Sequence, residues 1–227
     1  MEATLSHLKS LNPAPYETIV ADGNSLDETC RIAENHGVEV VKSLQLGRAA
    51  QMHEAALSAQ GDILCFLHAD TFPPKNLVNV VNETLADESV VLAGFRSIMK
   101  GNKTQHITSF HNRIKTYYAP FIYNPYRTLF KGLRLLFGDQ LMFCSKENYI
   151  KSGGFDPEVM IMEEADLCLK MNKLGRIIQL KEKVESSDRR VAKWGVLKAN
   201  FIFISIASLW ALRVPSQKLA KYYDHIR

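Results

Sequence analysis

A carboxylate closely follows a run of five apolar residues in the stretch Ile63-Leu64-Cys65-Phe66-Leu67-His68-Ala69-Asp70-Thr71. A short apolar run bounded by polar residues and prolines is typical of a buried strand. In open α/β sheets, ligands bind at the carboxyl ends of the strands. A charge at such a place is costly unless a cation or a hydrogen-bond donor meets it. The sequence therefore predicts that Asp70 belongs to a ligand site.

Short β-branched runs alternate with helix-length segments on both sides of this stretch, which is typical of βαβ units. The chain has 227 residues, 46% of them hydrophobic, so one core of substantial size is expected. We expect an α/β domain over residues 1–190, with a mostly parallel sheet flanked by helices, and a helical appendage over residues 191–227. Pro120 and Pro125 are expected to break a pair of helices. The expected strands cover residues 18–21, 38–41, 63–67, 90–95, 140–144 and 177–180.

Cysteine usage and the start of the sequence favour a cytoplasmic protein. The four cysteines lie far apart and form no CxxC pair, which excludes a zinc knuckle and a redox motif of that type. The first ten residues carry charge and resemble a helix, so no secretory signal is visible. The apolar segment 199–212 is too short to span a bilayer comfortably, and an interfacial or docking helix is expected there.

The positive charge is unevenly distributed. Residues 89–138 contain no Asp or Glu, and aromatic residues are interleaved with the cations there. This pattern suits a nucleic acid, a phosphorylated acceptor or a membrane surface, whereas the alternative is a solvated basic face over ordinary core aromatics. We expect no nucleic acid, and we expect an acceptor that carries phosphate or lipid, with peripheral contact to a membrane. The cations are Arg96, Lys100, Lys103, Arg113, Lys115, Arg127, Lys131 and Arg134.

Two acidic residues and one histidine lie near expected strand ends. Asp22 follows the strand at 18–21, where an ordinary turn that leads to a capped helix explains it equally well. Asp70 fits a divalent cation, because Mg²⁺ or Mn²⁺ uses one or two protein carboxylates and completes its shell with phosphate oxygens and water. His68 fits the same metal or a phosphate, and a packed core histidine is the alternative.

Several motifs occur in one order along the chain, and together they resemble the family 2 glycosyltransferases of GT-A (Rossmann-like) fold. The resemblance is to a bacterial-type subgroup with Gly-Arg-Ala-x-Gln before the acidic strand and His-Ala-Asp-Thr in place of the usual Asp-x-Asp motif. It covers about residues 17–190. Each of the eight motifs is weak alone, but the eight in register are specific together. The motifs are Asp22-Gly23-Asn24-Ser25, Gly47-Arg48-Ala49-Ala50-Gln51, Gly61-Asp62, His68-Ala69-Asp70-Thr71, Phe137-Gly138-Asp139-Gln140, Gly153-Gly154-Phe155, Met162-Glu163-Glu164 and Ser187-Asp188-Arg189-Arg190.

The resemblance implies metal-assisted, inverting transfer of a sugar from a nucleotide-sugar donor to a hydroxyl acceptor. It places Mg²⁺ or Mn²⁺ on Asp70, with His68 as a second candidate ligand, and a catalytic base on Glu164. Glu163 and Asp166 compete for the role of base, and an acidic first helical turn favoured by the helix dipole is the alternative for all three. Donor binding is expected at Asp22, Gly23, Asp27, Arg48, Gln51, Asp70, Asp139, Gln140, Arg189 and Arg190.

One departure from the family pattern concerns the first strand. Family members begin with a strand that ends in a Pro-x-x-Asn-Glu turn, whereas residues 1–11 here resemble the helix after it. We therefore expect a gap in the sheet beside the Asp22 strand, which another segment fills or which marks an incomplete chain. Two rival functions stay open: a nucleotidyltransferase of similar fold, and a non-catalytic or membrane-associated binding protein.

Overall fold

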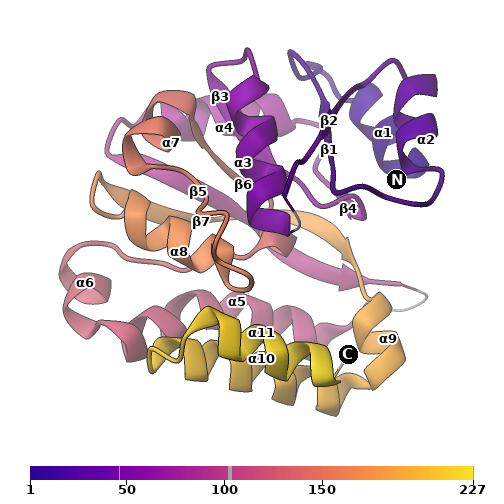
Figure 1. The fold of residues 1–227 in the computed structure, drawn as a ribbon. Helices are drawn as coiled ribbons and strands as arrows, with labels where there is room; N and C mark the ends of the chain where they lie inside the picture. Colours follow the sequence, from indigo (N-terminus) through magenta and orange to yellow (C-terminus); the bar gives the residue numbers. More distant parts are fainter. Residues whose placement is uncertain (46, 102–103, 227) are drawn as a thin grey trace.

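Two sheets form the centre of the computed structural model, which describes residues 1–45, 47–101 and 104–226 (Figure 1). Strands β1 (Ile19–Asp22) and β2 (Glu39–Lys42) form a parallel pair. The other sheet has five strands in the order β3-β6-β5-β7-β4. Strands β1 and β3 share no ladder within the described residues. The five strands are β3 (Ile63–Phe66), β4 (Thr71–Phe72), β5 (Val90–Lys100), β6 (Met142–Ser145) and β7 (Arg176–Ser187).

The larger sheet is mixed, which corrects the expectation of a mostly parallel sheet. Only β5 and β7 run parallel, whereas the pairs β3–β6, β5–β6 and β4–β7 are antiparallel. The alternation of strands and helices does not reveal strand direction. Between β5 and β6 the chain forms two helices and then returns through residues 131–137, which have no regular structure. Strand β6 therefore enters the sheet antiparallel to β5. The α/β class is confirmed.

Helices cover both faces of this sheet, so that alternate strand residues enter different cores. On β6, Met142 packs in the larger core and Phe143 in the core beneath α4. The larger core lies under α3, α7 and α8, and the second one also receives Leu8 from α1. The helices are α1 (Glu2–Lys9), α2 (Thr29–Asn35), α3 (Arg48–Ser58), α4 (Leu77–Leu85), α7 (Lys146–Ser152) and α8 (Glu163–Met171).

A helical layer lies along the lower edge of the view in Figure 1. The ring of Tyr123 stacks on Trp210 at 5.1 Å between centroids, and Asn200 donates to the Thr108 hydroxyl at 2.9 Å. No helix within the described residues is long and apolar enough to cross a membrane. The layer contains α5 (His106–Tyr123), α6 (Pro125–Phe130), α9 (Arg189–Trp194), α10 (Val196–Ala211) and α11 (Ser216–Ile226).

Pro120 lies inside α5 and does not break it, contrary to expectation. A proline cannot donate to the carbonyl four residues earlier, here that of Thr116. The backbone N–H of Leu135 donates to this carbonyl at 3.2 Å and so satisfies it. The helix ends instead at Tyr123, and Pro125 begins α6, so the break expected at Pro125 is confirmed. The side chain of Asn124, between the two helices, accepts from the N–H of Arg127 and caps α6.

Candidate functional site

An ion pair joins the first residues of two helices at the centre of the site. Arg48 begins α3 and Glu163 begins α8, and their Nη2 and Oε1 atoms lie 2.6 Å apart. Glu164 lies slightly farther away, with 3.9 Å between its Oε1 atom and Nη2 of Arg48. Glu163 is 1% exposed and Arg48 is 45% exposed, so the buried carboxylate meets a cation that water still reaches. The two acidic residues therefore differ: Glu163 is held by Arg48, and Glu164 is only loosely paired.

His68 and Gly138 bring a second side of the site against Glu164. The Nε2 atom of His68 lies 3.9 Å from Oε1 of Glu164. A Cβ atom on Gly138 would lie 2.1 Å from that Nε2 atom and 2.6 Å from Glu164 Oε1. Only glycine lets the backbone of the short 3₁₀ helix η1 (Gly138–Gln140) approach so closely. The imidazole and the carboxylate consequently converge on one point.

Burial and mutual charge shift the pKa values of this cluster. Burial, then the neighbouring charge of Glu164, raises the pKa of Glu163 to about 7, and Arg48 opposes the shift. Burial lowers the pKa of His68, although Glu164 acts in the opposite direction. The carboxylates of Glu164 and Glu163 raise the pKa of Arg48. Perturbed pKa values in a group of this kind are a feature of functional sites.

Asp139 and Gln140 follow Gly138 but face different surroundings. Asp139 accepts a hydrogen bond from Asn112 Nδ2 at 2.6 Å and lies 3.8 Å from Lys115 Nζ, both on α5. Gln140 is fully buried, and its side chain donates to the carbonyl of Asn112 at 3.0 Å. Gln140 therefore fastens η1 to α5, whereas Asp139 stays partly exposed beside the cluster. The charges of Asp139 and Asp70 both act to raise the pKa of His68, against the larger effect of burial.

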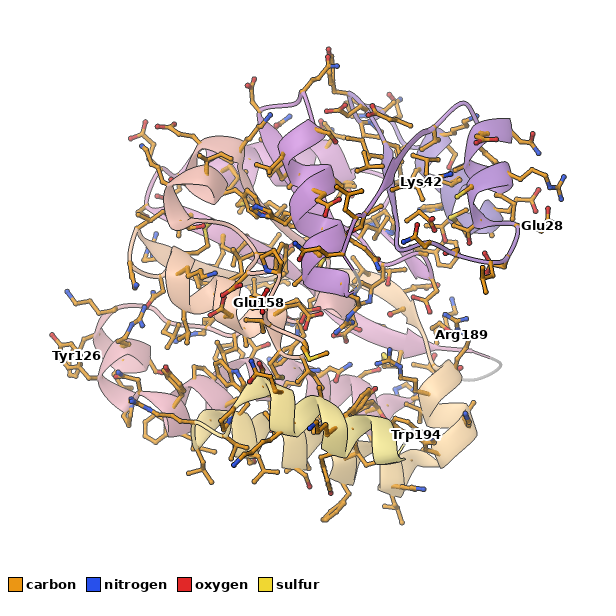
Figure 2. The ribbon with its side chains drawn as sticks, in the orientation of Figure 1. Glu28, Lys42, Tyr126, Glu158, Arg189 and Trp194 are labelled. Atoms are coloured by element: carbon orange, nitrogen blue, oxygen red, sulfur yellow. The ribbon has the colours of Figure 1, made fainter. Side chains whose placement is uncertain are left out.

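Asp70 meets a cation, which is one of the two kinds of partner that its position after an apolar strand predicts. Arg189, at the start of α9, donates from Nη2 to Oδ2 of Asp70 at 2.6 Å. Figure 2 shows Arg189 where β7 passes into α9. The backbone carbonyl of Asp70 also accepts from the N–H of Ser187 at 3.2 Å. The guanidinium of Arg190 turns elsewhere, 5.9 Å from the ring of Tyr223. The two arginines thus do not act together on Asp70.

The Asp22 turn is tied together by hydrogen bonds of its own. Asp22 is 2% exposed and accepts from the backbone N–H groups of Asn24 and Ser25 at 3.1 and 3.2 Å. Hydrogen bonds, chiefly with Ser25, lower its pKa. Gly23 lies against Gln51 of α3, where an added Cβ would come within 2.0 Å of the amide nitrogen. Asp27 is exposed and accepts from the N–H of Thr29 at 3.0 Å.

Asp166 pairs with a cation of its own helix. Its Oδ2 atom lies 2.8 Å from Nζ of Lys170, one turn later on α8. Sequence reasoning did not single out Gly138 or Asn112 as site residues. For Gly138 a signal existed, because it lies inside the Phe137 to Gln140 motif. For Asn112 none existed, because the side of its helix that faces the site depends on packing. Lys115 was named only as one of eight cations in the acid-free segment, and the fold places it beside Asp139.

Asp70 and His68 offer ligand atoms of the kinds that a divalent cation binds. Within residues 1–45, 47–101 and 104–226, no three His, Cys, Asp or Glu side chains gather into a group able to hold a metal ion. A Mg²⁺ or Mn²⁺ ion bound to a nucleotide needs only one or two protein carboxylates. Asp70 is one hard oxygen ligand that water reaches, and the Nε2 atom of His68 is buried without a hydrogen-bond partner among the described residues.

The sequence profile of glycosyl transferase family 2 matches residues 1–148. The chain belongs to glycosyl transferase family 2. Among curated relatives, uncharacterised glycosyltransferases of Mycobacterium tuberculosis and Mycobacterium bovis are 33% identical over 69 residues. That alignment covers 30% of this chain and 32% of each relative, so the match spans about a third of their length.

Solved structures of glucosyl-3-phosphoglycerate synthase from Mycobacterium tuberculosis share the fold of this family 2 chain. One complex with Mn²⁺, uridine diphosphate and glucosyl-3-phosphoglycerate superposes with a TM-score of 0.61 at 20% identity, over 94% of this chain and 77% of that one. A complex with Mg²⁺ and uridine diphosphate gives a TM-score of 0.60 at 18% identity, over 94% and 76%. At these identities the likeness establishes the GT-A-like fold.

Proposed function

We propose that this chain is a nucleotide-sugar-dependent glycosyltransferase that transfers a sugar to an acceptor hydroxyl group with inversion. One observation carries the proposal: His68, Gly138 and Glu164 converge from three separate segments, and the charges of Asp70 and Asp139 act on the same histidine. Glu164, whose carboxylate could accept a proton, thus lies near Asp70, whose carboxylate could bind a metal. Family membership and the donor-bound structures of similar fold support this assignment.

The catalytic base in this proposal is Glu164. Arg48 contacts Glu163 at 2.6 Å, and Lys170 contacts Asp166 at 2.8 Å, so both competing carboxylates already have close cationic partners. Glu164 lies 3.9 Å from both Arg48 and His68. A carboxylate held in place but not tightly paired can accept the proton of an attacking hydroxyl group. Glu163 and Arg48 act as positioning residues for Glu164.

The donor end of the proposed site is formed by Asp70 and Arg189. Asp70, with His68 as a second candidate, would hold Mg²⁺ or Mn²⁺, which when bound neutralises charge on the leaving nucleoside diphosphate. Arg189 is 79% exposed and reaches the same carboxylate, so its guanidinium is placed to bind diphosphate oxygens. The turn that contains Asp22 and the adjoining Gln51 would receive the nucleoside. Arg190 would join the diphosphate only after a change of rotamer.

The acceptor in this proposal carries phosphate or lipid. A structure of similar fold contains uridine-diphosphate-glucose and phosphoglyceric acid, which supports a phosphorylated acceptor. Lys115 supplies a cation beside Asp139 at the acceptor end of the site. We assign residues 1–190 to the transferase domain and residues 191–227 to a helical appendage that packs against α5. A cytoplasmic setting with peripheral contact to a membrane suits such an acceptor.

Donor hydrolysis tests the proposal most directly. Purified protein with Mn²⁺ should hydrolyse at least one nucleotide sugar of a donor panel slowly, and Asp70→Ala should abolish the reaction while the circular dichroism spectrum stays unchanged. Asp87→Ala is the matched control, because this aspartate also pairs with an arginine, Arg176, but outside the site. A panel without hydrolysis, together with no calorimetric binding of any nucleoside diphosphate, would refute the proposal and favour a non-catalytic binding protein.

A further inference from the structure

Two helices of the lower layer expose apolar stripes. On α5 the exposed apolar residues recur at intervals of three and four, which places them along one side of the helix. On α10 a shorter stripe has the same spacing, and Phe201 within it is 67% exposed. Such stripes normally face a core or a partner. Together with the exposed residues of α6 they form what we call the α5–α10 face. The stripes consist of Ile107, Phe110, Ile114, Tyr117 and Phe121 on α5, and Leu197, Phe201 and Ile204 on α10.

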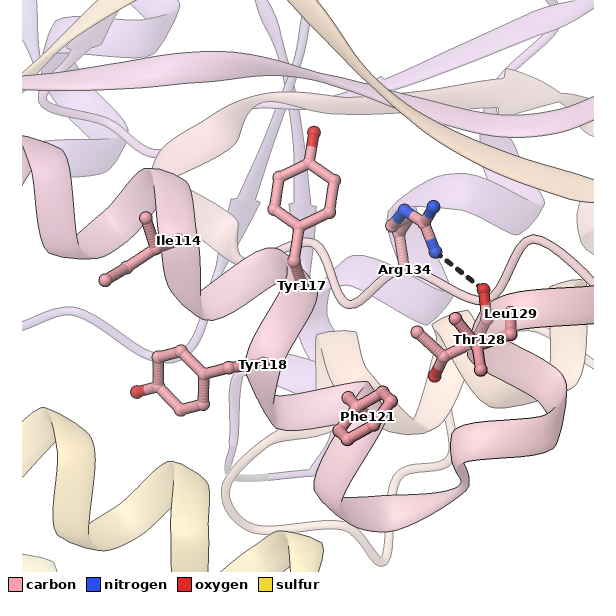
Figure 3. A pocket seen from close by; sticks show the side chains of 7 residues that line it. All are labelled: Ile114, Tyr117, Tyr118, Phe121, Thr128, Leu129 and Arg134. Carbon is pink, nitrogen blue, oxygen red and sulfur yellow. Dashed lines mark hydrogen bonds between the residues drawn. The ribbon is translucent and has the colours of Figure 1, made fainter.

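A pocket of about 530 Å³ opens on this face between α5 and α6 (Figure 3). Tyr117 and Phe121 line it from α5, and Leu129 lines it from α6. Arg134 lies at its edge, where its guanidinium donates to the carbonyl of Thr128 at 3.0 Å and lies 5.2 Å from the ring of Tyr117. An apolar hollow with one cation at its edge suits a hydrocarbon chain that ends in an anionic group.

The helical layer is entirely free of acidic residues over two long segments. Residues 104–138 and 189–223 contain twelve Lys and Arg residues and no Asp or Glu, although the chain has 24 acidic residues elsewhere. Several of these cations are exposed, among them Arg113 on α5, Lys131 after α6 and Lys198 on α10. Exposed apolar side chains bordered by cations are typical of surfaces that lie on anionic lipid.

We propose that the α5–α10 face docks on the surface of an anionic lipid bilayer. Phe110, Phe121 and Phe201 would enter the boundary between headgroups and acyl chains, while Arg113, Lys131 and Lys198 contact the headgroup phosphates. A second copy of the chain fits poorly, because a two-fold contact would set two acid-free cationic faces against each other. A nucleic acid would match the charge but leave the apolar stripes in contact with water.

Docking would place the acceptor end of the site close to the lipid. Helix α5 carries the apolar stripe on its outer side, and from its inner side Asn112 and Lys115 hold Asp139. One helix therefore joins the bilayer surface to the candidate site. The inference about the acceptor rests on the proposed function, and it narrows the acceptor to a molecule anchored in lipid. Docking itself does not depend on catalysis.

Vesicle co-sedimentation tests the docking. The protein should pellet with vesicles of phosphatidylcholine and phosphatidylglycerol in equal parts, but not with phosphatidylcholine alone. Phe110→Ser or Phe121→Ser should lower the partition coefficient about tenfold, because each removes an inserted aromatic side chain. Arg113→Glu and Lys198→Glu should each lower it at least about five-fold. Matched controls are Leu44→Ser, at a residue 93% exposed outside this face, and Lys181→Glu on β7; both should pellet like wild type.

Several results would overturn the docking. Equal losses in control and face variants would refute it, as would a failure to pellet with either vesicle. Self-association that Phe110→Ser abolishes, without vesicle binding, would show that a second copy covers the face. Catalysis is separable from docking: Phe110→Ser should keep donor hydrolysis, and Asp70→Ala should keep vesicle binding. If wild type neither hydrolyses a donor nor binds any nucleoside diphosphate while pelleting persists, the proposed function is refuted and the docking is supported.

Discussion

Replacing Glu163 with glutamine should change how stability depends on pH. Burial and the charge of Glu164 raise the pKa of the Glu163 carboxyl from an ordinary 4.5 to about 7. Between these values the unfolded chain has released the proton while the folded protein still holds it. The free energy of unfolding therefore falls as pH rises from 4.5 to 7. The two pKa values correspond to a total loss of about 3 kcal/mol at pH 7 and above.

In Glu163→Gln the free energy of unfolding does not fall in this way, because the glutamine side chain does not ionise. The difference in that free energy, variant minus wild type, should rise by about 3 kcal/mol between pH 4.5 and 7.5. His111 acts in the opposite direction, because burial lowers its pKa to about 4, so stability falls as pH drops from 6.5 toward 4. That contribution is present in both proteins and cancels in the difference. In wild type alone the two effects should largely offset each other between pH 4.5 and 6.5.

Urea unfolding followed by circular dichroism at half-unit steps of pH measures this difference. Glu182→Gln is the control, because Glu182 is an exposed residue on β7, and its curve should follow that of wild type. If the difference between Glu163→Gln and wild type stays constant from pH 4.5 to 7.5, then Glu163 ionises in the folded protein as it does in the unfolded chain. The inference that Glu163 is a buried positioning residue would then be wrong.

Two further changes test the close approach at Gly138 and the turn at Asp22. Gly138→Ala should lose most donor hydrolysis and about 1–3 kcal/mol of stability, because its Cβ would displace His68 and Glu164. Unchanged steady-state rates of hydrolysis would contradict the convergence of these side chains at Gly138. Asp22→Ala should lower the free energy of unfolding, measured in urea, by about 2 kcal/mol, because two backbone N–H groups lose a charged acceptor. Asp22→Asn should lower it less. Equal losses in the two variants would count against the role of Asp22 as the acceptor for these N–H groups.

The spacing of apolar residues predicted much of the fold, because the buried face of a strand or helix repeats its apolar residues at the period of that element. The apolar run at 63–67 became β3, and the stripe from Leu77 to Leu85 became α4. The far halves of β5 and β7 were not predicted, since Lys181 and Glu182 interrupt the apolar pattern there. Those halves pair with each other through their backbones over residues 96–100 and 183–187, and backbone pairing leaves no mark on the side-chain pattern.

The sequence by itself determined the family, the turn at Asp22 and the acidic start of α8, because these depend on neighbouring residues and on motifs in order. The tertiary structure alone decided which carboxylate of this turn meets Arg48. Arg48 comes from α3 to contact Glu163 at 2.6 Å, whereas Glu164 lies 3.9 Å from His68. The pairing of Lys170 with Asp166 is local, because the two residues lie one turn apart on α8. Asp70 is a similar case: the sequence predicted that its charge needs a cation or a hydrogen-bond donor, and only folding placed Arg189 there.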